Sequence, residues 1–333
     1  MPKLTTQVWT RRHLLGLADL SAEEIRAVLD TADEFFPYAT GAKAAPAILA
    51  SRTVLNLFCE DSTRTRTSFT LAAERLGARV IQFHAASSSL NKRETLADTA
   101  RTIEAMGLDA IVIRHQQKHA PHELAKVVAC SVLNGGDDAH EHPTQALLDM
   151  LALRRRLGRI EGLTVACVGD VRHSRVARSN LLGLTKLGSR VLFVGPQVFT
   201  DDLDVEVETA ADFDAVLPQC DAIMMLRVQF ERHEAVSLDM DEYIRKYQLT
   251  AERLGRARSG ALVLHPGPMN RGIELTSEVA DGPQSLVLFQ VTCGVAVRMA
   301  ALGLCIGALD RQDAAERPPN QKDAAHRPKK DAR

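Results

Sequence analysis

The sequence predicts an α/β protein with two tandem domains, each a parallel sheet flanked by helices. A length of 333 residues is more than one compact hydrophobic core usually holds, so two domains are expected. Short apolar runs alternate with longer amphipathic segments, a pattern typical of parallel sheets covered on both faces. The alternation repeats too often for one sheet of ordinary width.

The first element is predicted from a capping box. Ser21 is followed three residues later by Glu24, the spacing at which each side chain bonds the backbone of the other at a helix start. The next apolar residues share one helical face: Ile25, Val28, Leu29 and Ala32. Beyond this helix, apolar runs predict buried strands at 53–59, 79–83 and 109–113, and then at 163–168, 190–194, 221–226 and 261–264.

The joint between the domains is placed in a helix that begins at Pro143, because proline suits the first helical turn. This helix runs to Arg156, and the second set of strands follows at once. The sequence therefore predicts a first domain at 1–150 and a second at 151–286. A last apolar helix, at 287–310, has no strand after it, so we expect it to pack back on the first domain.

The chain changes character after this helix. Residues 311–333 contain no Leu, Ile, Val or Phe. Such a segment buries too little apolar area to offset its ordering entropy. The sequence predicts a disordered tail at 311–333.

Bulk composition narrows the function and the location. A formal net charge of -1 argues against a general nucleic-acid or anionic-membrane binder. The longest apolar stretch is interrupted by Gln290 and Arg298, so no membrane span is expected. The six cysteines are scattered in apolar runs, and the first residues lack the apolar core of a signal peptide. We therefore expect reduced thiols and a cytoplasmic protein.

The segment from Glu60 to Arg66 follows a predicted strand and opens a helix. Small hydroxyl residues and Arg64 stand at this helix start, where free backbone N–H groups and the helix dipole favour an anion. The alternative is an ordinary N-cap with exposed arginines, and local features favour the two about equally.

Two more polar positions lie at the ends of predicted elements. Arg114 follows a strand, and residues beyond strand carboxyl ends line the binding crevice of a parallel sheet. A glycine-marked loop at 134–142 enters the linker helix, and His142 and Gln145 share one side of its first turn. Taken singly, Arg114 is more often structural and His142 is more often a cap or core residue.

The tripeptide His140-Glu141-His142 invites comparison with metal sites. Its spacing lacks the i, i+4 geometry of H-E-x-x-H, and no cysteine pair accompanies it. Residues 165–170 resemble the start of a nucleotide-binding unit but lack G-x-G-x-x-G. The sequence predicts neither a metal nor an organic cofactor.

Two arginines follow strands of the second domain. Arg175 and Arg227 are each placed to bind a carboxylate through bidentate hydrogen bonds, which would suit a dicarboxylate substrate. Surface ion pairs are the better interpretation for either arginine alone. The turn at 265–268 (His-Pro-Gly-Pro) leaves backbone carbonyls exposed and allows a cis peptide.

Taken together, these segments resemble the aspartate carbamoyltransferases. Five motifs occur in the order seen in that family: Ser-Thr-Arg-Thr-Arg at 62–66, Lys92 with Glu-Thr-Leu at 94–96, His-Pro-Thr-Gln at 142–145, Arg-Val-Gln at 227–229 and His-Pro-Gly-Pro at 265–268. The similarity runs from about residue 10 to 310. The last two motifs resemble the aspartate branch, because ornithine enzymes carry His-Cys-Leu-Pro in the last place.

The resemblance implies roles for individual residues. Carbamoyl phosphate would be bound by Ser62, Thr63, Arg64, Thr65, Arg114, His142 and Gln145, and from a neighbouring subunit by Ser88, Ser89 and Lys92. L-aspartate would be bound by Lys92, Arg175, Arg227, Gln229, Gly267 and Pro268. The reacting carbamoyl group would contact the catalytic set, Thr65, Arg114, His142 and Gln145. Glu60 would pair with an active-site arginine.

The implied reaction transfers a carbamoyl group from carbamoyl phosphate to L-aspartate, a step of de novo pyrimidine biosynthesis, without a metal or cofactor. The resemblance further implies a homotrimer whose subunits share active sites, and it leaves open whether regulatory or dihydroorotase chains bind. Asp61 and Arg93 depart from the family pattern, in which proline or asparagine and glycine are usual. The alternatives are a catalytically weakened homologue that acts as an assembly subunit, and another carbamoyltransferase.

Overall fold

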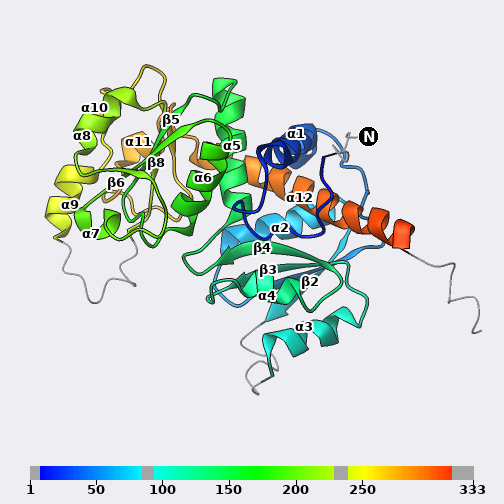
Figure 1. Cartoon of the computed structure of the whole chain (residues 1–333). Helices are drawn as coiled ribbons and strands as arrows, with labels where there is room; N and C mark the ends of the chain where they lie inside the picture. Colours follow the sequence, from blue (N-terminus) through cyan, green and yellow to red (C-terminus); the bar gives the residue numbers. More distant parts are fainter. Residues whose placement is uncertain (1–7, 85–93, 229–238, 317–333) are drawn as a thin grey trace, which may run out of the picture.

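The computed structural model of the chain describes residues 8–84, 94–228 and 239–316. Two parallel sheets form two bodies, and the last helix packs on the first of them (Figure 1). The elements of the first body, in chain order, are α1 (Ala22–Ala39), β1 (Thr53–Phe58), α2 (Thr63–Arg75), β2 (Arg79–His84), α3 (Leu96–Glu104), β3 (Ala110–His115), α4 (Ala120–Ala125) and β4 (Ser131–Asp137).

The linker helix and the second body follow. Their elements are α5 (Pro143–Leu157), β5 (Thr164–Val168), α6 (Arg175–Lys186), β6 (Arg190–Val194), α7 (Gln197–Thr200), β7 (Glu208–Ala210), α8 (Phe213–Val216), η3 (Leu217–Gln219), β8 (Ala222–Met225), α9 (Met240–Tyr247), α10 (Ala251–Leu254), β9 (Leu262–Leu264) and α11 (Ser277–Ala280). The chain then returns as α12 (Val287–Glu316).

Both sheets are parallel throughout the described residues, and each has a central switch point. The first has the order β2-β1-β3-β4, so the chain leaves β1 on one side and returns to it on the other. The second has the order β7-β6-β5-β8-β9, which makes β5 the corresponding strand. Ligands of open α/β sheets bind beyond the carboxyl ends of such strands. The topology therefore directs attention to the segments after β1, β3, β5 and β8.

Helices cover the first sheet on both faces, as the alternating pattern predicts. Helices α1, α2 and α12 lie on one face, and α3 and α4 lie on the other (Figure 1). The capping box of α1 is confirmed: the Ser21 hydroxyl accepts from Glu24 N at 3.2 Å, and the Glu24 carboxylate accepts from Ser21 N at 2.8 Å. The predicted apolar face of α1 is fully buried, mainly against α12.

Every strand predicted from the sequence is present, but β4 and β7 were not predicted. The prediction of a loop from residue 134 was wrong, because Asn134, Gly135 and Gly136 belong to β4. Two glycines and an asparagine disfavour a regular strand. The register between β3 and β4 shifts between Ile113 and His115, and glycines are common at such bulges. Strand β7 is only three residues long and largely exposed.

The last helix extends farther than predicted. It continues through Glu316, so the predicted disordered tail is wrong for residues 311–316, while 317–333 lie outside the described residues. Residues 311–316 (RQDAAE) are mostly good helix formers, and adding residues to an existing helix is far easier than nucleating one.

Helix α12 is the central helix of the molecule. Its segment Val287–Gly307 is long and apolar enough to cross a membrane, but 72% of the apolar stretch in this segment is buried inside the protein. It packs against α1, α5 and α2, which is how a core helix of a globular fold packs. One apolar cluster extends from this helix into the second sheet, and a smaller one fills the space between the first sheet and α3 and α4.

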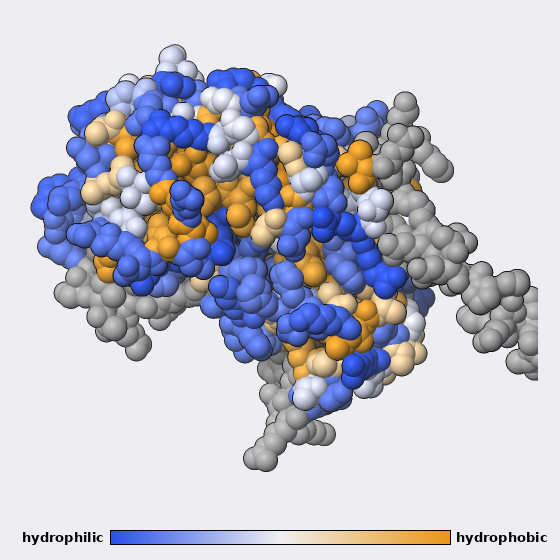
Figure 2. All heavy atoms as spheres, viewed as in Figure 1, coloured by the Kyte–Doolittle hydropathy of each residue, from blue (hydrophilic) through white to orange (hydrophobic). Residues whose placement is uncertain are grey.

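Polar side chains lie mainly on the surface and the cysteine thiols lie mainly in the interior. Hydrophilic side chains cover most of the face seen in Figure 2, with apolar side chains gathered mainly over the second sheet. All six cysteines are free, and each except Cys59 is buried, as the apolar runs around them predict.

Candidate active site

The start of α2 is an open helix terminus beyond the carboxyl end of β1. Ser62 is the N-cap, but its hydroxyl accepts no capping bond within the described structure, and the first turn contains no acidic residue. Backbone N–H groups at such a terminus attract anions. Of the two interpretations that the sequence left open here, this geometry favours the anion site over the ordinary N-cap.

Thr65 and His142 meet between α2 and α5. The Thr65 hydroxyl lies 3.4 Å from Nε2 of His142, and both side chains are buried. The backbone N–H of His142 donates to the Ser179 hydroxyl of α6 at 2.9 Å. Burial lowers the pKa of His142 well below its ordinary value, and the positive charges of Arg114, Arg298 and Arg175 lower it further. The imidazole is therefore neutral near pH 7.

One carboxylate joins arginines from the two sheets. Oε2 of Glu60 accepts from Nε of Arg114 at 3.1 Å and from Nη2 of Arg175 at 3.0 Å. The expectation that Glu60 pairs with an arginine is thus confirmed. A Cβ on Gly136 would lie 3.2 Å from Nη1 of each arginine, and its φ is +118°. Glycine in β4 therefore gives both guanidinium groups room to reach the crevice.

A second arginine pair lies beside the turn after β9. Burial lowers the pKa of Arg64, and the nearby positive charge of Arg227 lowers it further. A Cβ on Gly267 would lie 3.0 Å from Cζ of Arg64, and Gly267 has a φ of +65°. The cis peptide allowed for by the sequence joins Gly267 and Pro268. The turn of the second domain thus touches the start of α2 in the first.

Most of the residues singled out from the sequence are described by the structure, and contacts join several of them: Thr65 meets His142, Arg114 and Arg175 share Glu60, and Gly267 lies beside Arg64. The first domain supplies Ser62, Thr63, Arg64, Thr65, Arg114, His142 and Gln145, and the second supplies Arg175, Arg227, Gly267 and Pro268. The remaining predicted residues lie outside the described part of the chain: Ser88, Ser89, Lys92 and Gln229.

Comparison with known proteins decides the family. Residues 12–155 match the carbamoyl-phosphate-binding domain model of aspartate/ornithine carbamoyltransferases, and residues 161–305 match their aspartate/ornithine-binding domain model. The chain belongs to the aspartate/ornithine carbamoyltransferase family. The first matched segment contains α1 to β4 and most of α5, and the second contains β5 to α11 and most of α12, which packs back on the first body.

Named relatives within this family are similar to the chain over most of its length. The aspartate carbamoyltransferase catalytic subunit of Parafrankia sp. is 54% identical over 299 residues, which are 89% of this chain and 96% of the relative. The structure of aspartate transcarbamoylase from Trypanosoma cruzi with carbamoyl phosphate and aspartate is 30% identical, with a TM-score of 0.79 over 90% of this chain and 96% of that one. Ornithine carbamoyltransferase from Pyrococcus furiosus is also 30% identical, with a TM-score of 0.81 over 90% and 98%.

A buried carboxylate that was not predicted from the sequence holds together the helices behind the candidate site. Asp149 of α5 accepts from the side-chain amides of Gln145 (2.9 Å), Asn180 (2.8 Å) and Gln290 (2.7 Å). Gln290 also accepts from the backbone N–H of His265 at 3.0 Å. Burial raises the pKa of Asp149 to about 7, against the opposing effect of these amides and of Arg298. Asp149 thus links α5, α6, α12 and the turn after β9.

Arg298 is a buried cation behind the same crevice. Its guanidinium lies 5.1 Å from the ring centroid of Phe69 in α2, and burial lowers its pKa to about 9. A Cβ on Gly294 would lie 2.5 Å from Nη1 of Arg298. The sequence did carry a signal: Gln290, Gly294 and Arg298 are four residues apart on one face of an otherwise apolar helix.

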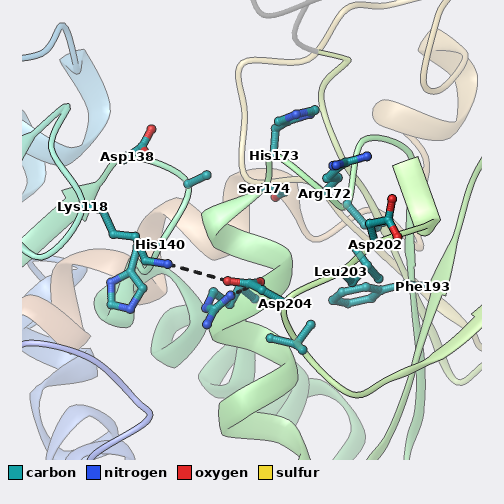
Figure 3. A pocket seen from close by; sticks show the side chains of 14 residues that line it. Lys118, Asp138, His140, Arg172, His173, Ser174, Phe193, Asp202, Leu203 and Asp204 are labelled. Carbon is teal, nitrogen blue, oxygen red and sulfur yellow. Dashed lines mark hydrogen bonds and ion pairs between the residues drawn. The ribbon is translucent and has the colours of Figure 1, made fainter. Parts of the chain in front are cut away.

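A cleft of about 250 Å³ lies between the two domains (Figure 3). Lys118 and His140 line it from the first domain, and Arg172 and Asp204 line it from the second. Nζ of Lys118 lies 3.6 Å from Oδ2 of Asp204 across it. None of the four crevice arginines, Arg64, Arg114, Arg175 and Arg227, lines this cleft. The four arginines and the open helix terminus therefore lie outside this cleft.

The position of Arg298 is tested by filling the space at Gly294. Gly294→Ala places a methyl group against Arg298 and within 3.0 Å of Leu148 Cδ2, and overpacking a core site costs about 1–3 kcal/mol. Gly307→Ala is the matched control in the same helix, because its Cβ meets nothing within 4 Å. Both variants gain the same helix propensity. We expect Gly294→Ala to be about 1–3 kcal/mol less stable than Gly307→Ala in urea unfolding at equal protein concentration. Equal stability would show that Arg298 is not confined.

Proposed function

We propose that this chain is the catalytic chain of an aspartate carbamoyltransferase. It transfers the carbamoyl group of carbamoyl phosphate to the amino group of L-aspartate and thereby serves de novo pyrimidine biosynthesis. The observation that carries the proposal is a set of four arginines drawn from both domains: Arg114 and Arg175 share Glu60, and Arg64 at the start of α2 interacts electrostatically with Arg227. Two anionic substrates require such an excess of positive charge.

The α2 half of the crevice suits carbamoyl phosphate. Phosphate oxygens accept from backbone N–H groups at the open helix terminus and from the hydroxyls of Ser62 and Thr63. Arg64 adds a charged donor at the same end of the helix. Thr65 and His142 lie deeper, in contact with each other, where they meet the carbonyl oxygen of the carbamoyl group.

The second-domain half suits a dicarboxylate. Arg175 stands at the first position of α6 and Arg227 just beyond β8, so the two guanidinium groups approach from different strand ends. Each binds one carboxylate of aspartate in the bidentate geometry that arginine favours. Carbonyl oxygens of the turn at Gly267 and Pro268 orient the amino group toward the carbamoyl carbon.

The reaction then needs only positioning and charge. The neutral amine of aspartate attacks the carbamoyl carbon, a C–N bond forms, and negative charge grows on the carbonyl oxygen. Thr65, Arg114 and neutral His142 donate hydrogen bonds to this oxygen. The bond from carbon to the bridging oxygen breaks, and phosphate leaves with the proton lost by the amine. Holding both substrates in one crevice supplies much of the rate.

The active site is shared between subunits of a homotrimer, and the enzyme works in the cytoplasm. The family resemblance implies that one segment contributes to the active site of the neighbouring subunit, with Ser88, Ser89 and Lys92 contacting the substrates bound there. Free thiols support a reducing compartment, since each of the six cysteines is unpaired.

The first test concerns the acceptor. Arg227→Ala leaves one aspartate carboxylate unpaired, which costs about 2–5 kcal/mol and lowers kcat/KM by roughly 30- to 1000-fold or more. The control is Arg271→Ala, whose guanidinium pairs with Asp281 at the surface and whose loss leaves kcat/KM nearly unchanged. Steady-state assays of the wild type with aspartate and with ornithine complete the test. Turnover of ornithine comparable with that of aspartate would reject the proposed acceptor.

The second test removes the charge that holds two arginines. Glu60→Gln keeps the shape of the side chain but weakens two charged hydrogen bonds, so kcat/KM falls about 10- to 100-fold. Asp61→Asn removes a charge one residue away, where the side chain is exposed, and it leaves the arginine pair intact. A Glu60→Gln enzyme with normal melting temperature and unchanged kcat/KM would contradict the role of Glu60.

The third test addresses the shared site. Lys92→Ala and His142→Ala are each nearly inactive as pure assemblies. When the two are dissociated and reassembled together, some interfaces combine an intact Lys92 with an intact His142, and activity returns. A site complete within one chain regains nothing, since every chain carries one lesion. Persistent inactivity in mixtures shown by mass spectrometry to contain both chains would reject sharing through Lys92.

A further inference from the structure

Three histidines gather on the first domain outside the proposed active site. His119 and His122 lie at the start of α4, and His140 lies in the loop between β4 and α5. Their ring centroids are 4.1 Å (His119 to His140), 5.3 Å (His119 to His122) and 5.9 Å (His122 to His140) apart. The carbamoyl-transfer chemistry described above uses none of them.

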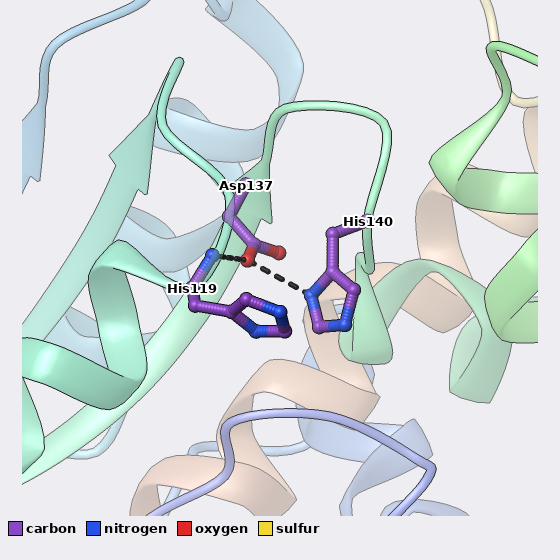
Figure 4. A group of neighbouring side chains, drawn as sticks. All are labelled: His119, Asp137 and His140. Carbon is purple, nitrogen blue, oxygen red and sulfur yellow. Dashed lines mark hydrogen bonds and ion pairs between the residues drawn. The ribbon is translucent and has the colours of Figure 1, made fainter.

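A buried carboxylate fixes two members of the cluster (Figure 4). Oδ2 of Asp137, at the end of β4, accepts from the backbone N–H of His119 at 2.8 Å and lies 3.0 Å from Nδ1 of His140. Oδ1 of Asp137 accepts from the amide of Asn134 and from the backbone N–H of Glu141. A carboxylate that orients a histidine ring in this way also strengthens its remaining nitrogen as a metal ligand.

The other two rings each keep a nitrogen that makes no hydrogen bond among the described residues, although Nε2 of His122 lies 3.8 Å from Oδ2 of Asp19. Nδ1 of His122 is buried without a hydrogen-bond partner among the described residues. His119 is exposed and has a φ of +64°, a left-handed conformation that is costly for a residue with a Cβ. Burial does not account for a histidine at position 119, whereas a ligand would.

We propose that His119, Asp137 and His140, with the ring of His122 beside them, bind a divalent transition-metal ion such as Zn²⁺. One ligand atom each of His119, Asp137 and His140 lies within 4.8 Å of the others. Bonds of ~2.1 Å at tetrahedral angles separate ligand atoms by roughly 3.4 Å and imidazole centroids by about 5 Å. The three ring separations bracket that value, and the exposed His119 side chain has freedom to close the remaining gap.

The type of ion follows from the donor atoms. Imidazole nitrogens favour Zn²⁺, Ni²⁺ or Cu²⁺ over Mg²⁺ and Ca²⁺, which prefer oxygen. His140 also lines the cleft between the domains (Figure 3), which gives the ion a path from solvent.

No metal site was predicted from the sequence, because the only candidate ligands recognised by their spacing were those of His140-Glu141-His142. The side chains of this tripeptide contact different partners: His140 meets Asp137, Glu141 accepts from the backbone of Leu17, and His142 meets Thr65. Position 119 is far from this tripeptide in the chain, so spacing along the chain did not reveal it. A bound ion would cross-link α4 to the loop that ends at His142.

The test uses the full-length assembly, stripped with a chelator and titrated with ZnCl₂ by calorimetry. We expect one saturable site per chain with micromolar or tighter affinity, and a melting temperature that rises with Zn²⁺ because the ion binds the folded state. His119→Gly removes one ligand while favouring the observed φ. The melting temperature of this variant without metal should be equal or higher, and its affinity for Zn²⁺ at least tenfold weaker.

A matched control separates this site from general binding to histidines. His173 stands three residues after Asp170, and Nδ1 of His173 lies 2.9 Å from that carboxylate, the same arrangement as His140 with Asp137. Among the described residues, no third His, Cys, Asp or Glu side chain stands at metal-binding distance from this pair, so His173→Ala should leave Zn²⁺ affinity unchanged. Absence of saturable Zn²⁺ binding would overturn the proposal. Equal Zn²⁺ affinity in the wild type and in His119→Gly would overturn it too, because the ion would then bind elsewhere, for example at a thiol.

Discussion

The burial of a single carboxylate, that of Asp149, is the constraint on which the junction of the two domains depends. A carboxyl group with no solvent costs several kcal/mol unless its oxygens are hydrogen-bonded. Asp149 meets this requirement only when amides from α5, α6 and α12 all reach it. A rigid-body shift of either domain breaks at least one of these bonds. The carboxylate thereby fixes the linker helix, and the linker helix carries His142 and Gln145.

The same logic operates at Glu60, closer to the substrates. Two guanidinium groups repel each other, and in an empty crevice they have no substrate anion to hold them together. The carboxylate of Glu60 contacts both and keeps them in the crevice before any ligand arrives. Arg114 belongs to the first sheet and Arg175 to the helix after the first strand of the second. Preorganised charge of this kind is worth most at sites shielded from water.

The sequence predicted the parts of the structure that depend on local pattern. Buried parallel strands appear as short apolar runs, and the capping box at Ser21 gives the start of α1. Strand β4 escaped notice because Gly135 and Gly136 are typical of loops, although here they give room to two arginine side chains.

The arginines of the crevice were found because residues after parallel strands share one edge, and because the motifs resemble a known family. Asp149 and Arg298 were missed for a different reason. Asp149 shows no pattern within α5 that marks it as important. In α12 the spacing of Gln290, Gly294 and Arg298 marks one face, but it does not report which helix that face meets. The extension of α12 was missed because composition describes a chain on its own, whereas a helix already formed recruits the residues that follow it.

The position of α12 has a consequence for how the polypeptide matures during synthesis. This helix fills the core between α1, α2 and α5, yet it is the last helix of the described chain to leave the ribosome. The segment from β5 to β9 is contiguous, so it acquires all its strands while α12 is still being translated. Until α12 emerges, the nascent first domain exposes the apolar sides of α1, α2 and α5 that this helix covers. Transiently exposed apolar surface of this kind is what chaperones bind, so ribosome pausing before residue 287 prolongs the interval in which the unfinished protein is prone to aggregate.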